Sequence, residues 1–199
     1  MNAQPKLDMQ TDSTVQIRLA ELCEAAVIAN VLRVSFDEFQ LRYMTEAFIA
    51  TTPNEDRVRS RMREGPAWVA VTGDAIVGTA SVVKKADGAL YIRGMAVVRE
   101  ARGKRIAERL LLEIEGYAVA YNCSRLTLST TPFLTSAIRL YDRFGFRFVA
   151  EGPDTLFGTP IVNMEKLLRG ESEYYEEHRK EELCRKIMDT LLTETPASA

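Results

Sequence analysis

Apolar and polar residues alternate in the first segment of this chain that shows a regular pattern. Residues 14–20 place apolar side chains at every second position, which is typical of a half-buried strand. In residues 21–36 the apolar side chains recur every three or four positions instead, and this spacing predicts an amphipathic helix. A further helix is expected to begin at residues 52–55 and to end at Gly65-Pro66, a pair that is typical of helix ends.

The middle of the chain predicts an antiparallel meander. Residues 68–71 and 75–83 are strand-like and flank Thr72-Gly73-Asp74, a short turn of the length found in β-hairpins. A second turn at residues 86–88 leads into a third strand at residues 89–98. Three consecutive strands joined by short turns are expected to pair side by side.

The C-terminal half of the chain alternates helices with strands. The best helix of the sequence covers residues 106–121 with one continuous apolar stripe, and residues 125–130 predict the strand that follows it. The next helix is expected to take Thr135 as its N-cap and to end at Gly145. Two further strands are expected at residues 146–151 and 159–168.

This order of elements predicts the class of fold. A meander followed by a strand–helix–strand crossover favours one α/β (α+β) domain with a mixed, mostly antiparallel central sheet. The domain is expected to span residues 14–168, after a flexible N-terminus at residues 1–13. Residues 169–199 predict a C-terminal helical extension with one apolar face, which either packs on its own domain or forms a homodimer interface.

Composition and charge narrow the classes of function. Of the 199 residues, 46% are hydrophobic and 27% charged, and the formal net charge of −2 differs from the basic balance of a general nucleic-acid binder. Cys23, Cys123 and Cys184 are far apart and His178 is the only histidine, so neither a disulfide framework nor a metal site is expected. The sequence shows no signal peptide and no apolar run of bilayer length, so we expect a cytoplasmic protein that binds no membrane.

A cluster of cations surrounds the start of the helix at residues 106–121. Helix N-termini carry a partial positive charge, so basic side chains there lower stability unless an anion binds. Gly103 and Lys104 precede the helix and the small Ala107 lies in its first turn, an arrangement that contains the parts of an anion-binding turn. On charge alone, a solvated basic face is the better interpretation. The nucleotide-binding motifs G-x-x-x-x-G-K-[ST] and G-x-G-x-x-G are both absent from the sequence.

Two motifs, RGKRIA at residues 102–107 and AIRLYDRFGF at residues 137–146, make the chain resemble the GNAT superfamily of N-acetyltransferases. Residues 102–107, RGKRIA, resemble that family's acetyl-coenzyme A motif, [QR]-x-x-G-x-[GA], in its first and last positions, but Arg105 stands where the family has an internal glycine. Residues 137–146, AIRLYDRFGF, resemble its second signature, a helix with a tyrosine shortly before Gly-Phe. The resemblance covers residues 14–168 and implies the GNAT fold, with splayed parallel strands 4 and 5 and helices on both faces of the sheet.

The resemblance also implies a cosubstrate and the residues that bind it. Acetyl-coenzyme A (acetyl-CoA) is expected between the splayed strands, with its pantetheine arm along residues 95–97 and its diphosphate at the loop that follows. Arg99 or Lys104 is implied as the contact to the 3′-phosphate of the adenosine. The implied cofactor-binding residues are Met95, Ala96, Val97, Arg102, Gly103, Lys104, Arg105, Ile106 and Ala107.

The implied catalytic residues are Tyr141 and the backbone N–H near Val97. By resemblance, Tyr141 hydrogen-bonds the sulfur and acts as general acid, and the N–H stabilises the oxyanion; from its spacing alone, Tyr141 is a core aromatic. The strand at residues 91–95 lacks the glutamate that many relatives use as base. Asp37, Glu38, Glu46 and Glu151 lie in segments that line the acceptor side in the family and are otherwise surface acids.

Arg93 has two interpretations. In the first, its side chain projects into the acceptor cleft, which favours an acceptor with a carboxylate or phosphate over a polycation. In the second, its side chain pairs with an acid on the neighbouring strand. Leu134 is a second departure from the family, which often has an asparagine there.

We therefore expect an N-acetyltransferase that moves an acetyl group from acetyl-CoA to a primary amine of a small molecule or peptide, by direct transfer in a ternary complex. The alternative is a non-catalytic acyl-CoA-binding module, which the missing strand carboxylate and Arg105 favour. A weaker hypothesis is a nucleic-acid or anion-binding protein that uses the basic cluster.

Overall fold

The computed structural model describes residues 15–168 of the chain. The expected flexible N-terminus at residues 1–13 and the expected helical extension at residues 169–199 lie outside the described residues. Within the described part the chain forms two compact units, each with buried apolar side chains. The first unit contains residues 15–82 and 93–113, and the second contains residues 83–92 and 114–168.

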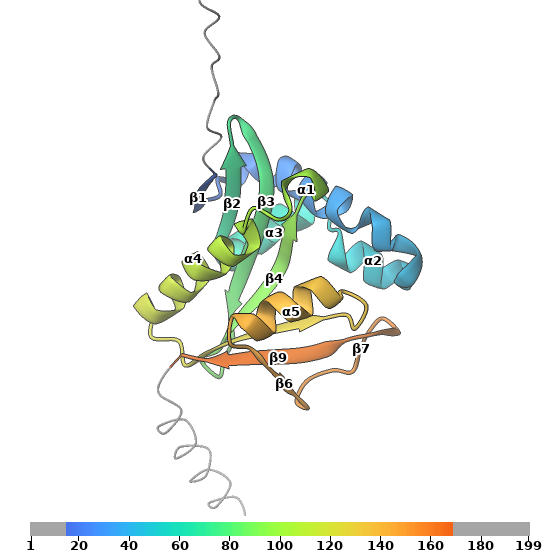
Figure 1. Ribbon diagram of the computed structural model, residues 1–199, viewed down its shortest axis with the longest axis vertical. Helices are drawn as coiled ribbons and strands as arrows, with labels where there is room; N and C mark the ends of the chain where they lie inside the picture. The colour runs from blue at the N-terminus through green and yellow to red at the C-terminus, as the bar shows by residue number, and fades with distance from the viewer. Residues whose placement is uncertain (1–14, 169–199) are drawn as a thin grey trace, which may run out of the picture. The chain divides into compact units, whose positions relative to one another are not determined.

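The first unit contains the predicted hairpin. β1 (Gln16–Leu19) runs antiparallel to β2 (Ala67–Thr72), and β2 runs antiparallel to β3 (Ala75–Lys84), with a shift of register at Ala70/Val71. β2 and β3 are the two long neighbouring arrows in Figure 1. The helices of this unit are η1 (Leu22–Glu24), α1 (Ala25–Phe36), η2 (Asp37–Arg42), α2 (Thr45–Thr51), α3 (Glu55–Glu64) and η3 (Arg99–Ala101).

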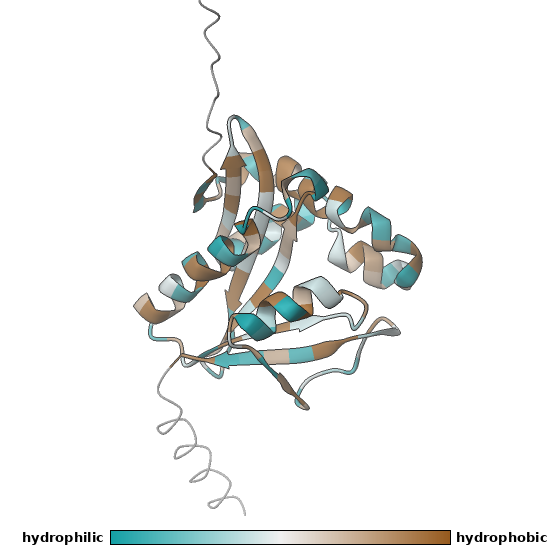
Figure 2. Ribbon diagram, in the orientation of Figure 1, coloured by the Kyte–Doolittle hydropathy of each residue, from teal (hydrophilic) through white to brown (hydrophobic). Residues whose placement is uncertain are grey.

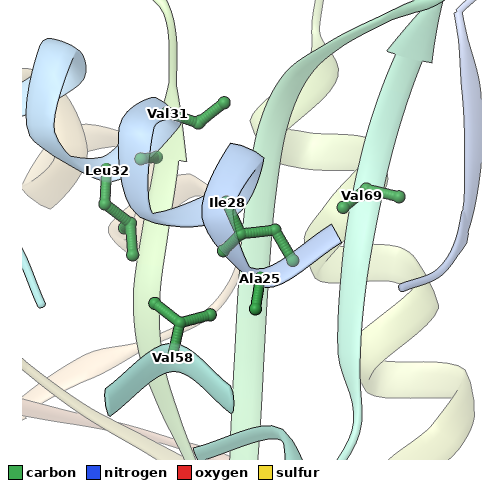
Figure 3. Close-up of a cluster of buried hydrophobic side chains, with 7 residues drawn as sticks. Ala25, Ile28, Val31, Leu32, Val58 and Val69 are labelled. Atoms are coloured by element: carbon green, nitrogen blue, oxygen red, sulfur yellow. The ribbon is translucent and has the colours of Figure 1, made fainter. Parts of the chain in front are cut away.

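Helix α1 supplies most of a buried apolar cluster in the first unit, and α3 adds Val58 to it. The apolar residues of α1 lie three and four positions apart, so one face of the helix is buried against the strands. Burying one such aliphatic side chain contributes about 1.5–3 kcal/mol to stability. Figure 3 shows Ala25, Ile28, Val31, Leu32, Val58 and Val69 in this cluster.

The predicted strand–helix–strand crossover consists of β4, α4 and β5. The first residues of β4 (Leu90–Val97) pair in parallel with β5 (Arg125–Thr130), from Leu90 opposite Leu126 to Ile92 opposite Leu128. The registered pairing ends there, although β4 continues to Val97. α4 (Ile106–Ala120) begins in the first unit and ends in the second. In Figure 2 its hydrophilic and hydrophobic residues alternate as teal and brown bands along the helix. The other elements are α5 (Thr135–Arg143), β6 (Arg147–Val149), β7 (Thr155–Leu156), β8 (Thr159–Pro160) and β9 (Val162–Leu167).

The hydrogen-bonded order of the strands confirms the predicted fold class. Seven strands pair in the order β1-β2-β3-β4-β5-β9-β6, and β7 and β8 form a separate small hairpin. β5 and β6 both run antiparallel to β9, whereas β4 and β5 are parallel. The sheet is therefore mixed and mostly antiparallel, as the order of the predicted elements indicated.

Two details of the secondary structure differ from the predictions. Leu134, not Thr135, is the N-cap of α5, and its side chain makes no capping hydrogen bond, so the prediction of Thr135 as the cap was wrong. The expected strand at residues 159–168 is divided into β8 and β9, and β7 was missed, since a two-residue strand leaves no periodic signal. The helix start at residues 52–55 is confirmed by the Asn54 side chain, which accepts a hydrogen bond from the N–H of Arg57 at 3.0 Å.

Candidate active site

The expected pantetheine segment follows a break in β4. Gly94 has a φ of +60°, a backbone conformation that favours glycine and that interrupts the regular pleat of a strand. A Cβ at Gly94 would lie 3.6 Å or more from its neighbours, so the conformation, and not lack of space, requires glycine here. The Ser81 hydroxyl donates a hydrogen bond to the carbonyl oxygen of Arg93 at 3.0 Å and holds the strand just before the break. Beyond it, Ala96 is buried and Met95 and Val97 are half-buried.

The Arg93 side chain reaches helix α3, and its acidic partner lies on that helix and not on a neighbouring strand. Its Nη1 donates to Glu64 Oε2 at 2.7 Å and its Nη2 donates to the carbonyl oxygen of Arg61 at 3.0 Å. Arg61 carries one of the last carbonyls of α3, so Arg93 also caps that helix. The expected acid on the neighbouring strand is therefore replaced by Glu64, which sequence reasoning missed because the two residues are far apart in the chain.

The pKa of Glu64 is lowered by the hydrogen bond from Arg93, which outweighs the opposing effect of burial, and the charges of Arg93, Arg57 and Arg61 lower it further. Since the folded state binds this proton less tightly than the unfolded state, the ion pair stabilises the fold above the ordinary value of 4.5 and less as the pH falls below it. The stability difference between the wild type and Glu64→Gln is therefore expected to shrink from neutral pH to about pH 3. Urea denaturation of both proteins across this range measures it; a difference that stays constant would contradict the assignment.

The loop before α4 has the backbone geometry of a tight turn. Gly103 and Arg105 have φ values of +81° and +58°, so two of its residues are left-handed. α4 follows directly, and its first intrahelical hydrogen bond runs from the N–H of Arg109 to the carbonyl oxygen of Arg105 at 3.0 Å. The N–H groups of Ile106 and the two residues after it therefore belong to the first turn, which has no acceptors inside the helix. A tight turn leading into a helix N-terminus is a site that favours an anion.

Arg105 takes the backbone conformation that the family's glycine would allow. Its side chain is exposed and folds back onto α4, where Nε and Nη2 donate to the two carboxylate oxygens of Glu108 at 2.8 Å each. This hydrogen bond raises the pKa of Arg105. The departure from the motif therefore leaves the loop left-handed at this position, and the Arg105 charge is paired with an acid of the first helical turn.

We expect glycine to be tolerated at position 105 and a β-branched residue to be harmful. Arg105→Gly relieves left-handed strain and is expected to leave the melting temperature nearly unchanged, whereas Arg105→Val is expected to lower it by about 2–4 °C. The matched control is Arg109→Gly inside α4, where glycine costs helix stability and is expected to lower the melting temperature by a similar ~2–4 °C. Differential scanning calorimetry compares the three variants. If Arg105→Gly is as destabilising as Arg109→Gly, Arg105 is not left-handed.

Three cations around the loop keep their charge available for an anion. Arg99, Lys104 and Arg109 are exposed and make no ion pair with any of the described residues. Arg102, in contrast, is paired with Glu38 at 2.6 Å. The basic cluster around the start of α4 is therefore not uniformly a solvated basic face. Some of its cations are paired with acids, and others keep their charge available.

The second unit holds Tyr141 in its core. Tyr141 is only 8% exposed, and its ring lies 5.8 Å from the ring of the fully buried Phe146. The N–H of Phe146 also donates to the carbonyl oxygen of Tyr141 at 2.9 Å, closing the end of α5. Tyr141 is thus buried against Phe146, and its catalytic role stays a prediction.

A side-chain clamp in the second unit was not anticipated from the sequence. The Ser129 hydroxyl donates to Asn163 Oδ1 at 2.7 Å, and Asn163 Nδ2 donates to the carbonyl oxygen of Pro153 at 3.0 Å. A Cβ at Gly152 would lie 2.9 Å from the Asn163 amide, so this glycine permits the close approach. The clamp fixes the segment that contains Glu151. The sequence offered one weak signal, the Gly152-Pro153 pair, which is typical of a turn.

The remaining candidate acids are surface residues. Asp37, Glu46 and Glu151 are exposed, and Glu38 is engaged by Arg102. Between residues 15 and 168, no group of three or more His, Cys, Asp or Glu side chains is arranged to hold a metal ion. Within the same residues, no helix combines the length and the apolar character that crossing a membrane requires.

Solved acetyltransferases share this fold. The structure is similar to that of a GNAT-family acetyltransferase from Staphylococcus aureus, with a TM-score of 0.66 and 18% identity over 78% of this chain and 100% of that chain. It is also similar to the PaiA N-acetyltransferase from Thermoplasma acidophilum in complex with coenzyme A, with a TM-score of 0.64 and 19% identity over 77% of this chain and 99% of that one. At these identities the likeness establishes the fold.

The family follows from the sequence match. The chain belongs to the acetyltransferase (GNAT) family, whose model matches residues 28–146. A curated relative, the N-acetylaspartate synthetase of Danio rerio, is 36% identical over 102 residues, which cover 50% of this chain and 36% of the relative. The chain thus matches about a third of the length of that relative. Family membership confirms the resemblance drawn from RGKRIA and AIRLYDRFGF.

Proposed function

We propose that the protein is an N-acetyltransferase that moves an acetyl group from acetyl-CoA to a primary amine of a small molecule or peptide, by direct transfer in a ternary complex. The observation that carries this proposal is the left-handed turn at Gly103 and Arg105, which leads into the N-terminus of α4 inside the segment matched by the family model. The coenzyme A bound to the Thermoplasma relative supports acetyl-CoA as the cosubstrate.

The residues of the first unit fit a diphosphate. Left-handed residues before a helix N-terminus provide N–H donors, and Arg99 and Lys104 offer exposed charge beside them. We assign the diphosphate to residues 102–107 and the pantetheine arm to Met95, Ala96 and Val97. When bound, acetyl-CoA supplies the thioester to be cleaved.

Direct transfer assigns distinct tasks to the residues of this chain. The N–H near Val97 stabilises negative charge on the thioester oxygen, and the Tyr141 hydroxyl donates to the departing sulfur. A tyrosine with an ordinary pKa of about 10 is a weaker acid than a thiol near 8.5, so hydrogen bonding to sulfur contributes alongside proton transfer. The amine must lose a proton, since an amine of pKa about 10.4 is neutral in only about one molecule in a few thousand at pH 7. Asp37, Glu46 and Glu151 are the candidate bases.

For the acceptor, we propose a small amine that carries a carboxylate. The name of the Danio rerio relative, N-acetylaspartate synthetase, supports this class over a polycation. The alternative function is a non-catalytic acyl-CoA-binding module, since β4 carries no carboxylate at residues 90–97.

Two measurements test the proposed function. Acetyl-CoA at about one hundred times its Kd is expected to stabilise the protein by about 2.7 kcal/mol, seen as a rise in melting temperature. Thiol release is then followed across a panel of amines that contains aspartate, a peptide N-terminus, a lysine analogue and a polyamine. Release that only carboxylate-bearing amines accelerate supports the acceptor class. Binding without accelerated release by any amine favours the non-catalytic module, and the absence of any stabilisation overturns both.

A further inference from the structure

Arg102 contacts three segments of the first unit at once. Its Nε donates to the carbonyl oxygen of Val97 at 3.3 Å, its Nη2 donates to the carbonyl oxygen of Ser35 at 3.2 Å, and its Nη1 donates to Glu38 Oε1 at 2.6 Å. These partners lie at the end of β4, in the last turn of α1 and in η2. Although the motif places Arg102 at the diphosphate loop, its guanidinium therefore donates to acceptors within the protein.

The contact to Val97 fixes a peptide plane. The carbonyl of Val97 and the N–H of Val98 belong to the same planar unit. Arg102 donates to the carbonyl on one side, and the N–H on the other side donates to the carbonyl oxygen of Val77 at 2.9 Å. Both ends of the unit are thus held, so the end of β4 has little freedom to rotate where the proposed transfer takes place.

The contacts to Ser35 and Glu38 fix the junction of α1 and η2. The last four carbonyls of a helix lack intrahelical donors, and Arg102 satisfies that of Ser35. Ser35 is 4% exposed, so its carbonyl lies in a largely dry environment where an unmade hydrogen bond is costly. The planar fork of arginine reaches this carbonyl and the Glu38 carboxylate together, which a lysine cannot do.

We propose that Arg102 is a positioning residue that couples the acetyl-CoA loop to the segment at residues 35–42. This inference rests on the proposed function and deepens it: occupation of the loop stabilises Arg102, and Arg102 in turn holds the α1–η2 junction and the end of β4 in place. We call the hydrogen bonds from Arg102 to Val97, Ser35 and Glu38 the Arg102 clamp. Glu38 is then a member of this clamp and not the base that removes the amine proton. The competing assignment makes the Arg102 guanidinium itself a phosphate ligand, in addition to the backbone of residues 102–107.

The variants Arg102→Lys and Glu38→Gln separate the two assignments. The clamp requires both residues, so each variant is expected to speed amide hydrogen exchange at residues 35–42 in the free protein and to raise the KM for the amine about two- to fivefold. Acetyl-CoA is expected to slow that exchange in the wild type and less in either variant. Glu55→Gln is the matched control, because it breaks another exposed Arg–Glu pair of the first unit, with Arg59, outside the proposed site.

A direct phosphate ligand gives a different pattern. Glu38→Gln would then leave exchange at residues 35–42 and the KM for the amine at wild-type values, and Arg102→Lys would raise only the Kd for acetyl-CoA measured by calorimetry. That result overturns the coupling. If the wild type transfers no acetyl group, the proposed function fails, and hydrogen exchange of the free proteins still decides whether the clamp exists.

Discussion

Tyr141→Phe is expected to lower kcat for acetyl transfer by about a hundredfold, the size of effect typical of losing a general acid. The variant removes only the hydroxyl, which is proposed to donate to the departing sulfur, and keeps the ring that packs at 5.8 Å from Phe146. Since the ring stays in place, the Kd for acetyl-CoA is expected to change little. Steady-state kinetics together with calorimetric titration of acetyl-CoA measure the two quantities separately.

The control for this variant is Tyr121→Phe, which removes a hydroxyl from a surface tyrosine. Tyr121 is 58% exposed and stacks on Tyr117 with ring centroids 4.2 Å apart. The kcat of Tyr121→Phe is expected to match that of the wild type. If Tyr141→Phe retains wild-type kcat, Tyr141 is a core aromatic and nothing more. If its melting temperature falls together with kcat, the activity loss is measured again below the onset of unfolding to separate the two causes.

Lys104→Glu is expected to weaken acetyl-CoA binding by about tenfold or more. The substitution replaces an attraction to the diphosphate with a repulsion, and charges a few ångströms apart in a partly solvated site interact by about 1–4 kcal/mol. Because the site is exposed to salt, the loss is expected to shrink as ionic strength rises. Calorimetric titration at low and high salt measures both the change in Kd and its salt dependence.

Arg57→Glu provides the matched charge reversal on α3. Arg57 is exposed, and a carboxylate in the first turn of a helix is favourable, so the variant is expected to fold normally and to bind acetyl-CoA as the wild type does. If the two reversals weaken binding equally, the long-range net charge of the protein governs binding, and residues 102–107 are not the diphosphate site.

The fold was largely predictable because its signals are local. The alternation before Leu19, the hairpin turn at Gly73 and the apolar stripe of α4 each depend on neighbours in the sequence. The parallel pairing of β4 with β5 followed from the helix between them, since parallel strands need a crossover. Short elements without a period, such as β7, left no comparable signal.

For the candidate site, the sequence indicated a backbone segment but not the pairing of its side chains. The motif identified the segment around Arg102, yet its partner Glu38 lies in η2, sixty-four positions earlier in the chain. Likewise, nothing local indicates that Arg93 pairs with Glu64 at the end of α3. Arg105 is a different case. A positive φ is uncommon for arginine, so only the resemblance to a glycine position of the motif indicated this left-handed conformation.

Acetyl transfer is measured most directly by mass spectrometry of the amine after incubation with the protein and acetyl-CoA labelled in its acetyl group. We predict that a carboxylate-bearing amine gains one labelled acetyl group on nitrogen, that one thiol is released for each product molecule, and that Tyr141→Phe slows both together. The contradicting result is a protein that binds acetyl-CoA yet leaves every amine unlabelled, with thiol release no faster than in buffer.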